Sequence, residues 1–309
     1  TAMRLAIVSQ CEGFQNTQHR LANAFAERAN AFKYINKIGR TQLQDAVPMT
    51  LGQEFAGFAA TIREDIAIIE RLSQLLLEVN LGGTAIGTRV NTPDGYAELA
   101  VAKLRLVSEL DVQLASDLVE ASSDTGAYVT FSSVLKRIAV KLSKICNDLR
   151  LLSSGPRSGF HEINLPPVQA GSSIMPGKVN PVIPEVVNQV AFQVIGNDMT
   201  VTMAAEAGQL QLNAFEPVIV LNVLQSMRIL MQAMDTLSTR CIAGITADAA
   251  QCEGQLENSL VLATRLVPHL GYATSAKIAK TALAEGLSVT DAALKLGLAT
   301  KDQLATYLA

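Results

Sequence analysis

The chain has 309 residues, of which 49% are hydrophobic and only 17% are charged, with 25 Lys and Arg against 28 Asp and Glu. A soluble domain usually carries about 25% charged residues, so this chain must hide an unusual share of its surface. No stretch reaches the roughly 18 uncharged apolar residues of a membrane-spanning helix, and no run of basic residues offers a nucleic-acid footprint. We therefore expect neither a membrane nor a nucleic-acid partner. The hidden surface should face a large core or another subunit.

The cysteines and the first residues indicate the compartment. Cys11, Cys146, Cys241 and Cys252 lie far apart, without the short paired spacings of zinc sites or disulfide frameworks. Buried reduced thiols in a cytoplasmic protein are the expected state. The opening residues TAMRLAIVSQ lack the basic start of a signal peptide and begin inside an apolar-periodic segment, which suggests that further sequence precedes them.

Helical periodicity predicts the main elements in chain order. Apolar residues recur every three or four positions over residues 55–79 and again over 128–152. Residues 182–205 are apolar nearly all round, which predicts a helix surrounded by other helices. A further stripe over 217–234 opens with a proline, a residue that suits the first helical turn.

These stripes predict the fold class. Helices of about 25 residues are close to 40 Å long, and neither a period-two strand nor an Asn-Gly hairpin interrupts them. We predict an all-α chain, with a bundle of long helices over residues 1–248 and a small helical domain over 249–309. Within the second domain, SVTD at 288–291 and TKDQ at 300–303 have the spacing of capping boxes.

Three polar segments interrupt the helical pattern, and they are the candidates for chemistry. They are GRTQLQDAVP at 39–48, GGTAIGTRVN at 82–91 and GSSIMPGKVNP at 171–181. In the third, Pro181 can begin a helix, so Lys178 and Asn180 would lie near the positive end of its dipole. That arrangement favours a carboxylate ligand. A solvated loop with a helix cap is the alternative on chemistry alone.

The three segments resemble those shared by the aspartase/fumarase superfamily, in the same chain order. GSSIMPGKVNP is similar to its signature, and GRTQLQDAVPMTLGQEF and GGTAIGTRVN are similar to its other two segments. NDLRLLSSGPR at 147–157 and VTMAAEAGQLQLN at 201–213 resemble the aspartate ammonia-lyase branch more than the fumarase branch. The resemblance covers essentially the whole chain, but an N-terminal domain of the superfamily has no counterpart in it.

This resemblance implies a homotetramer that pools its long helices, with active sites built from three subunits. It implies the reversible elimination of ammonia from L-aspartate to give fumarate, through an aci-carboxylate intermediate. The site residues that it implies are Ser172 as the general base, Lys178 and Asn180 as carboxylate ligands, and Thr41 and Gln42 as further pocket residues. Ser173, next to Ser172, stays open as the base.

Two departures from the superfamily pattern leave alternatives open. Gln42 stands where fumarase-like members carry a His that pairs with a Glu matching Glu185, and Arg89 stands where a Gly is usual. A glutamine cannot act as an acid or a base near neutral pH, and its presence favours the aspartase branch. The alternatives are a fumarase, a lyase for a substituted aspartate, or an inactive assembly domain. We expect no cofactor and no metal ligands, with a divalent metal as an effector left open.

Overall fold

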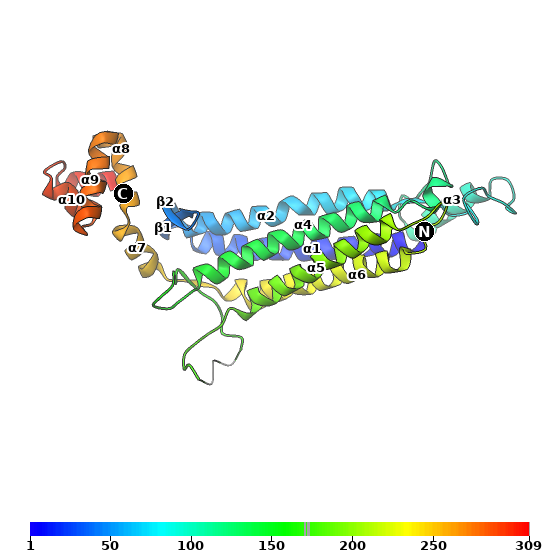
Figure 1. Cartoon of the computed structure of the whole chain (residues 1–309), viewed down its shortest axis with the longest axis horizontal. Helices are drawn as coiled ribbons and strands as arrows, with labels where there is room; N and C mark the ends of the chain where they lie inside the picture. Colours follow the sequence, from blue (N-terminus) through cyan, green and yellow to red (C-terminus); the bar gives the residue numbers. More distant parts are fainter. Residues whose placement is uncertain (170, 172–173, 309) are drawn as a thin grey trace. The chain divides into compact units, whose positions relative to one another are not determined.

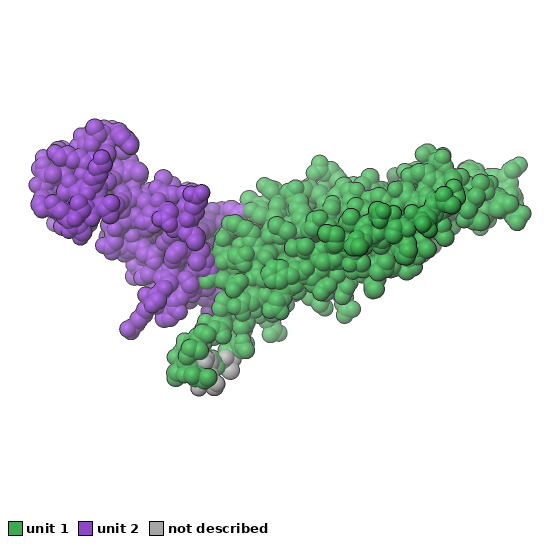
Figure 2. Space-filling view, in the orientation of Figure 1, with its two compact units in different colours: residues 1–24, 58–150, 166–244 green, residues 25–57, 151–165, 245–309 purple. Residues whose placement is uncertain are grey.

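The computed structural model describes residues 1–169, 171 and 174–308, which form two compact units (Figure 2). Unit 1 comprises residues 1–24, 58–150 and 166–244, and unit 2 comprises residues 25–57, 151–165 and 245–309. The chain therefore enters each unit more than once. The boundary expected between residues 248 and 249 stays a prediction.

Five long helices dominate the structure and confirm the predicted all-α bundle. They are α1 (Ala2–Ala31), α2 (Leu51–Ser73), α4 (Gly126–Leu152), α5 (Val182–Glu206) and α6 (Glu216–Arg240). Figure 1 shows them lying side by side, with the shorter α3 (Tyr96–Ser108) at one end of unit 1. Near α3, the short strand β3 (Glu78–Val79) pairs in parallel with β4 (Gln113–Leu114).

The seam predicted over residues 128–152 is buried along all of α4. Its members, each at most 5% exposed, are Tyr128, Phe131, Leu135, Ile138, Leu142, Ile145, Leu149 and Leu152. Full burial of one such side chain contributes about 1.5–3 kcal/mol. This seam is therefore a main source of the bundle's stability, and a charge inserted into it would disrupt the packing.

Two buried aspartates form ion pairs that join α4 to α2 and to α5. Asp65 of α2 pairs with Arg137 at 2.8 Å and with Lys141 at 3.0 Å. Asp198 of α5 pairs with Lys136 at 2.5 Å. Removing one partner of a buried ion pair typically costs about 3–5 kcal/mol, so these contacts fix how α2 and α5 are turned relative to α4.

Residues 182–205 are predicted to be surrounded by helices, and one chain covers only part of α5. α5 packs along α6 but leaves a row of large apolar side chains exposed. Those exposed by more than a third are Val186, Phe192, Ile195, Met199 and Met203. Sequence alone shows that a helix is apolar all round, but not whether its own chain or another one covers it.

One described helical stretch, Glu216–Gly244, is long and apolar enough to cross a membrane by length and composition alone. This is weak evidence, since a core helix also meets these two criteria. Half of the apolar window is buried inside the structure. In the predicted stripe, Val220, Met227 and Met234 are buried, whereas Leu224 and Met231 are half-buried.

A β-hairpin lies in unit 2 where the sequence predicted no strand. Strand β1 (Asn36–Thr41) pairs antiparallel with β2 (Gln44–Thr50), with a register shift between Gly39 and Arg40. The turn residues Gln42 and Leu43 have φ values of 52° and 61°. A two-residue hairpin turn needs positive φ at both positions and usually carries Asn-Gly for that reason. Here Gln-Leu takes the turn, so the expected signal is missing.

Unit 2 is completed by short helices and one more strand pair. They are α7 (Ala249–Asn258), α8 (Ala263–Leu270), α9 (Tyr272–Glu285), α10 (Val289–Lys295) and α11 (Lys301–Leu308), with β5 (Ile163–Asn164) antiparallel to β6 (Thr246–Ala247). Their core contains Leu266, Ile278, Ala292 and Leu304, each at most 1% exposed.

Both predicted capping residues, Ser288 and Thr300, cap their helices, and Thr300 with Gln303 forms the full reciprocal box. The Asp291 amide donates to Ser288 Oγ at 3.0 Å. The Gln303 amide donates to Thr300 Oγ1 at 3.3 Å, and Gln303 Oε1 accepts from the Thr300 amide at 2.8 Å. A second full box, Thr50 with Gln53, begins α2 with the same two reciprocal bonds. Such side chains satisfy amides that have no partner inside the helix.

The buried thiols should make the protein less stable in alkaline solution. All four cysteines are free and buried, and burial raises the pKa of Cys11 to about 11 and of Cys241 and Cys252 to about 12, from 9.0. Above pH 9 the unfolded chain loses thiol protons that the folded chain keeps, so folding stability should fall between pH 9 and 11. Below pH 9 the thiols should have no effect.

Thermal unfolding measured in steps from pH 8 to pH 11 checks this expectation. The Cys252→Ala variant should show a shallower loss of unfolding temperature above pH 9 than the parent chain. Identical slopes would contradict the assignment.

Candidate active site

The segment 171–181 runs directly into α5. Lys178 and Asn180 are both exposed just ahead of Val182, the first residue of α5. Asn180 is held by its backbone, since its carbonyl accepts a hydrogen bond from the Val182 amide at 2.9 Å. Ser172 and Ser173 lie outside the described residues, so the choice of base stays a prediction.

The start of α5 is suited to an anion. Pro181 is the N-cap residue, and no side chain of the described residues makes a capping hydrogen bond there. The N-terminus of a helix carries about half a positive charge, and Lys178 adds a full one nearby in the chain. A carboxylate is the natural ligand for this combination.

Segment 82–91 lies at the other end of unit 1. Figure 1 shows it beside α3, whereas residues 174–181 lie at the end of the bundle where α5 begins. With 25 residues, α5 alone spans about 38 Å between these ends. One copy of unit 1 therefore cannot bring both segments to one small substrate.

Within segment 82–91, backbone geometry fixes two positions. A Cβ atom on Gly87 would lie 2.2 Å from the Leu118 carbonyl carbon, so only glycine fits. Arg89 has φ of 59°, a conformation that L residues rarely adopt, and its guanidinium pairs with Glu98 of α3 at 2.7 Å. Arg89 thus has a carboxylate partner within its own chain.

Thr41 and Gln42 lie at the hairpin tip, which we define as residues 41–44. Both are exposed, and both belong to unit 2, whereas Lys178 and Asn180 belong to unit 1. Thr41 closes the strand ladder opposite Gln44. The turn therefore presents two adjacent polar side chains to solvent.

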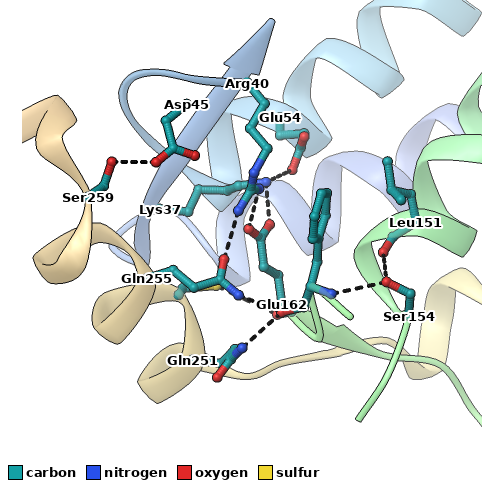
Figure 3. Close-up of polar contacts among 12 residues, drawn as sticks. Lys37, Arg40, Asp45, Glu54, Leu151, Ser154, Glu162, Gln251, Gln255 and Ser259 are labelled. Atoms are coloured by element: carbon teal, nitrogen blue, oxygen red, sulfur yellow. Dashed lines mark hydrogen bonds and ion pairs between the residues drawn. The ribbon is translucent and has the colours of Figure 1, made fainter. Parts of the chain in front are cut away.

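A group of buried charges lies next to this hairpin, and we call Lys37, Arg40, Glu54 and Glu162 the charge cluster (Figure 3). Glu162 is fully buried and Lys37 is 2% exposed. The Lys37 ammonium lies 2.5 Å from Glu162 Oε2 and 2.7 Å from Glu54 Oε2. Arg40 pairs with Glu162 Oε1 at 2.5 Å, so one carboxylate holds two cations of β1.

Two further contacts hold the guanidinium of Arg40. It donates to Gln255 Oε1 at 2.8 Å and lies over the Phe160 ring, 4.2 Å from the centroid. The sequence analysis missed this cluster. Only a weak signal was present: Lys37 and Glu162 each precede a buried isoleucine of a strand, Ile38 of β1 and Ile163 of β5, and a charge in such a place needs a partner.

Glu185 has a different partner from the one in the superfamily pattern. It lies in the first turn of α5, and its carboxylate is 3.8 Å from Arg150 of α4. Arg150 also donates to the Asn188 side chain at 3.3 Å. With Gln42 in place of His, the pairing of Glu185 with Arg150 gives this carboxylate a cationic partner inside its own unit.

Among the described residues, no group of three or more His, Cys, Asp or Glu is placed to hold an ion.

Comparison with known proteins places the chain in a family. Residues 1–196 match the family described as lyase, and residues 262–309 match the fumarase C C-terminus. Aspartate ammonia-lyase from Pseudomonas aeruginosa is 57% identical over 292 residues, which are 94% of this chain and 62% of that protein. The Escherichia coli K12 protein of the same name is 54% identical over 98% of this chain and 64% of that protein.

Solved structures agree with this assignment. The cobalt-bound fumarate lyase:delta crystallin from Brucella melitensis superposes with a TM-score of 0.96 at 60% identity, covering 99% of this chain and 66% of that one. The class II fumarase from Schistosoma mansoni gives 0.92 at 31% identity, covering 100% and 68%. The chain thus spans somewhat less than two-thirds of the length of these aspartate ammonia-lyases. It belongs to the lyase family of the aspartase/fumarase superfamily.

Proposed function

We propose that the protein is an aspartate ammonia-lyase, which eliminates ammonia from L-aspartate to give fumarate. The observation that carries the proposal is the start of α5, where Lys178 and Asn180 precede a helix N-terminus without a side-chain cap among the described residues. Its support from similarity is the identity of 57% to a named aspartate ammonia-lyase.

In this reaction, Ser172 takes the proton from the carbon next to the one that bears the amino group. The electron pair moves into the neighbouring carboxylate and forms an aci-carboxylate dianion. Collapse of the dianion forms the double bond and breaks the carbon–nitrogen bond, and ammonia leaves. Lys178, Asn180 and the α5 dipole supply preorganised positive charge for the dianion. The same field favours the serine alkoxide that acts as base.

Thr41 and Gln42 bind the substrate by hydrogen bonds in this proposal. The Gln42 amide can donate to a carboxylate and accept from an ammonium group. It does not act as an acid or a base near pH 7, so no proton relay passes through it. Substrate orientation is therefore the role that fits position 42.

The partner that completes the site is a further copy of the chain, in a homotetramer. Two observations support this: the exposed apolar row of α5, and the placement of segments 82–91 and 174–181 at opposite ends of unit 1. Burial of such a row between copies is favourable at about 25 cal/mol per Å². We also propose a cytoplasmic location, and chemistry that needs no cofactor, with a divalent metal at most as an effector.

The absorbance of fumarate at ultraviolet wavelengths tests the function directly. L-Aspartate should give a steady rise in absorbance, and L-malate should give none. The assay uses the longest form of the protein that its source encodes. Turnover of malate but not aspartate would favour a fumarase, which the similarity to the class II fumarase makes the second candidate. An assembled protein that turns over neither, and binds no fumarate at millimolar concentration, would be an assembly module.

A further inference from the structure

The hairpin tip depends on contacts outside itself for its position. Every residue from Thr41 to Asp45 is exposed, and the turn residues Gln42 and Leu43 both have positive φ. Such a turn is strained for L residues and persists only where surrounding structure determines it. On the β2 side, Asp45 accepts a hydrogen bond from Ser259 at 2.6 Å. The β1 side must be held by the residues that precede Thr41.

On the β1 side, the charge cluster holds the hairpin tip in place. Arg40, directly before Thr41, pairs with Glu162, and Lys37 pairs with the other oxygen of the same carboxylate. Side chains three positions apart point to opposite faces of a regular strand. The register shift after Gly39 falls between them, and such an irregularity increases the local twist. Glu162 thus pairs with two residues of β1, Lys37 and Arg40, and Arg40 is adjacent to the tip.

The backbone of Glu162 is itself held by segments other than the hairpin. Its amide donates to the Leu152 carbonyl at 2.9 Å, and its carbonyl accepts from the Asp248 amide at 2.9 Å. The Phe160 carbonyl, two residues earlier, accepts from the side chain of Gln255 at 2.7 Å. The carboxylate therefore extends from a backbone that is anchored independently of the hairpin.

We infer that Glu162 is a positioning residue for the substrate-binding tip: its buried carboxylate holds Lys37 and Arg40 and thereby sets the place of Thr41 and Gln42. This inference rests on the proposed function for its effect on catalysis. Its effect on the hairpin is independent of that function.

The kinetic test compares Glu162→Gln and the milder Glu162→Asp with a matched control. Misplacement of substrate-binding groups by about 1 Å can cost up to about a hundredfold, so KM for L-aspartate should rise at least about tenfold, and kcat should fall less. Asp65→Asn is the control, because Asp65 is also a buried carboxylate that holds two cations, Arg137 and Lys141. It should lower the unfolding temperature and leave KM unchanged.

A second readout follows the hairpin itself. The chain has no tryptophan, so Leu43→Trp places one tryptophan, excited selectively over tyrosine at long wavelength, at the tip, where Leu43 is 62% exposed. In this background, Glu162→Gln or Glu162→Asp should lower the steady-state anisotropy, and Asp65→Asn should not. Glu162→Asp keeps the charge and serves where Glu162→Gln fails to fold.

The two readouts separate the inference from the function it rests on. Lower anisotropy in a protein that shows no lyase activity would support the positioning role and remove the proposed function. An active enzyme in which Glu162→Asp changes neither KM nor anisotropy would overturn the positioning role. The same holds if Asp65→Asn raises KM as much as the Glu162 variants do.

Discussion

Ser172→Ala should remove nearly all formation of fumarate from L-aspartate while leaving substrate binding intact. General-base catalysis contributes about 10²- to 10⁴-fold to rate, and loss of the base should lower kcat by a factor in that range. KM should change little, because Lys178, Asn180 and the α5 N-terminus bind carboxylate groups without the serine. Steady-state kinetics over a range of aspartate concentrations measures both parameters.

Ser173→Ala is the matched control, since it removes a hydroxyl from the adjacent residue of the same segment. It should retain kcat within a few-fold of the parent enzyme. If Ser173→Ala loses activity and Ser172→Ala keeps it, the base is Ser173 and the order of the two serines is reversed. If both variants keep full kcat, the base is neither serine, and the assignment taken from the signature segment fails.

The sequence is sufficient to predict those parts of the fold in which the interacting residues lie close together in the chain. The seam of α4 follows from spacing alone, because three-four alternation places Tyr128 and Leu152 on one buried stripe. The helix caps at Ser288 and Thr300 follow equally well, since their partners are three residues away. Local periodicity and local hydrogen bonds carry this information.

The missed features have causes that are not local. The hairpin turn at Gln42 and Leu43 lacks Asn and Gly, so its backbone conformation is imposed by pairing and by the charge cluster. Glu162 meets Lys37 and Arg40 across more than a hundred residues of chain. The exposed row of α5 has the composition of a buried helix. Spacing rules contain no information on which distant segment, or which copy, completes such a contact.

The residues of the candidate site likewise divide into those that the sequence predicts and those that only the structure shows. Resemblance of three segments identified the residues to examine, and the structure shows that two of these segments lie at opposite ends of unit 1 (Figure 1). Glu162 belongs to none of the segments and was found only through its contacts. A motif shows which side chains react, whereas the contacts behind them show what holds those side chains in place.

Mixing two inactive variants should restore activity if each site combines residues from different copies. We take the exposed Thr88 as the substrate contact of segment 82–91. Thr88→Val and Ser172→Ala should then each be nearly inactive alone. In a protein refolded from an equal mixture, half of the copies carry an intact segment 82–91 and the other half an intact segment 171–181. Each of the two segments in a site is therefore intact with a probability of one half. Activity should therefore recover to about a quarter of the parent value, as expected for random assembly of a symmetric oligomer.

A second mixture serves as the control, because its two variants cannot complement each other. Ser172→Ala mixed with Lys178→Met should stay inactive, because both changes fall on the segment that one copy supplies. Recovery in this mixture would mean that residues 172 and 178 reach the site from different copies. No recovery with Thr88→Val, in tetramers shown by two different affinity tags to contain both variants, would mean that one copy supplies both segments. Because α5 separates the two segments by about 38 Å, that result would contradict their placement at opposite ends of unit 1. Full activity of Thr88→Val alone would exclude Thr88 from the site.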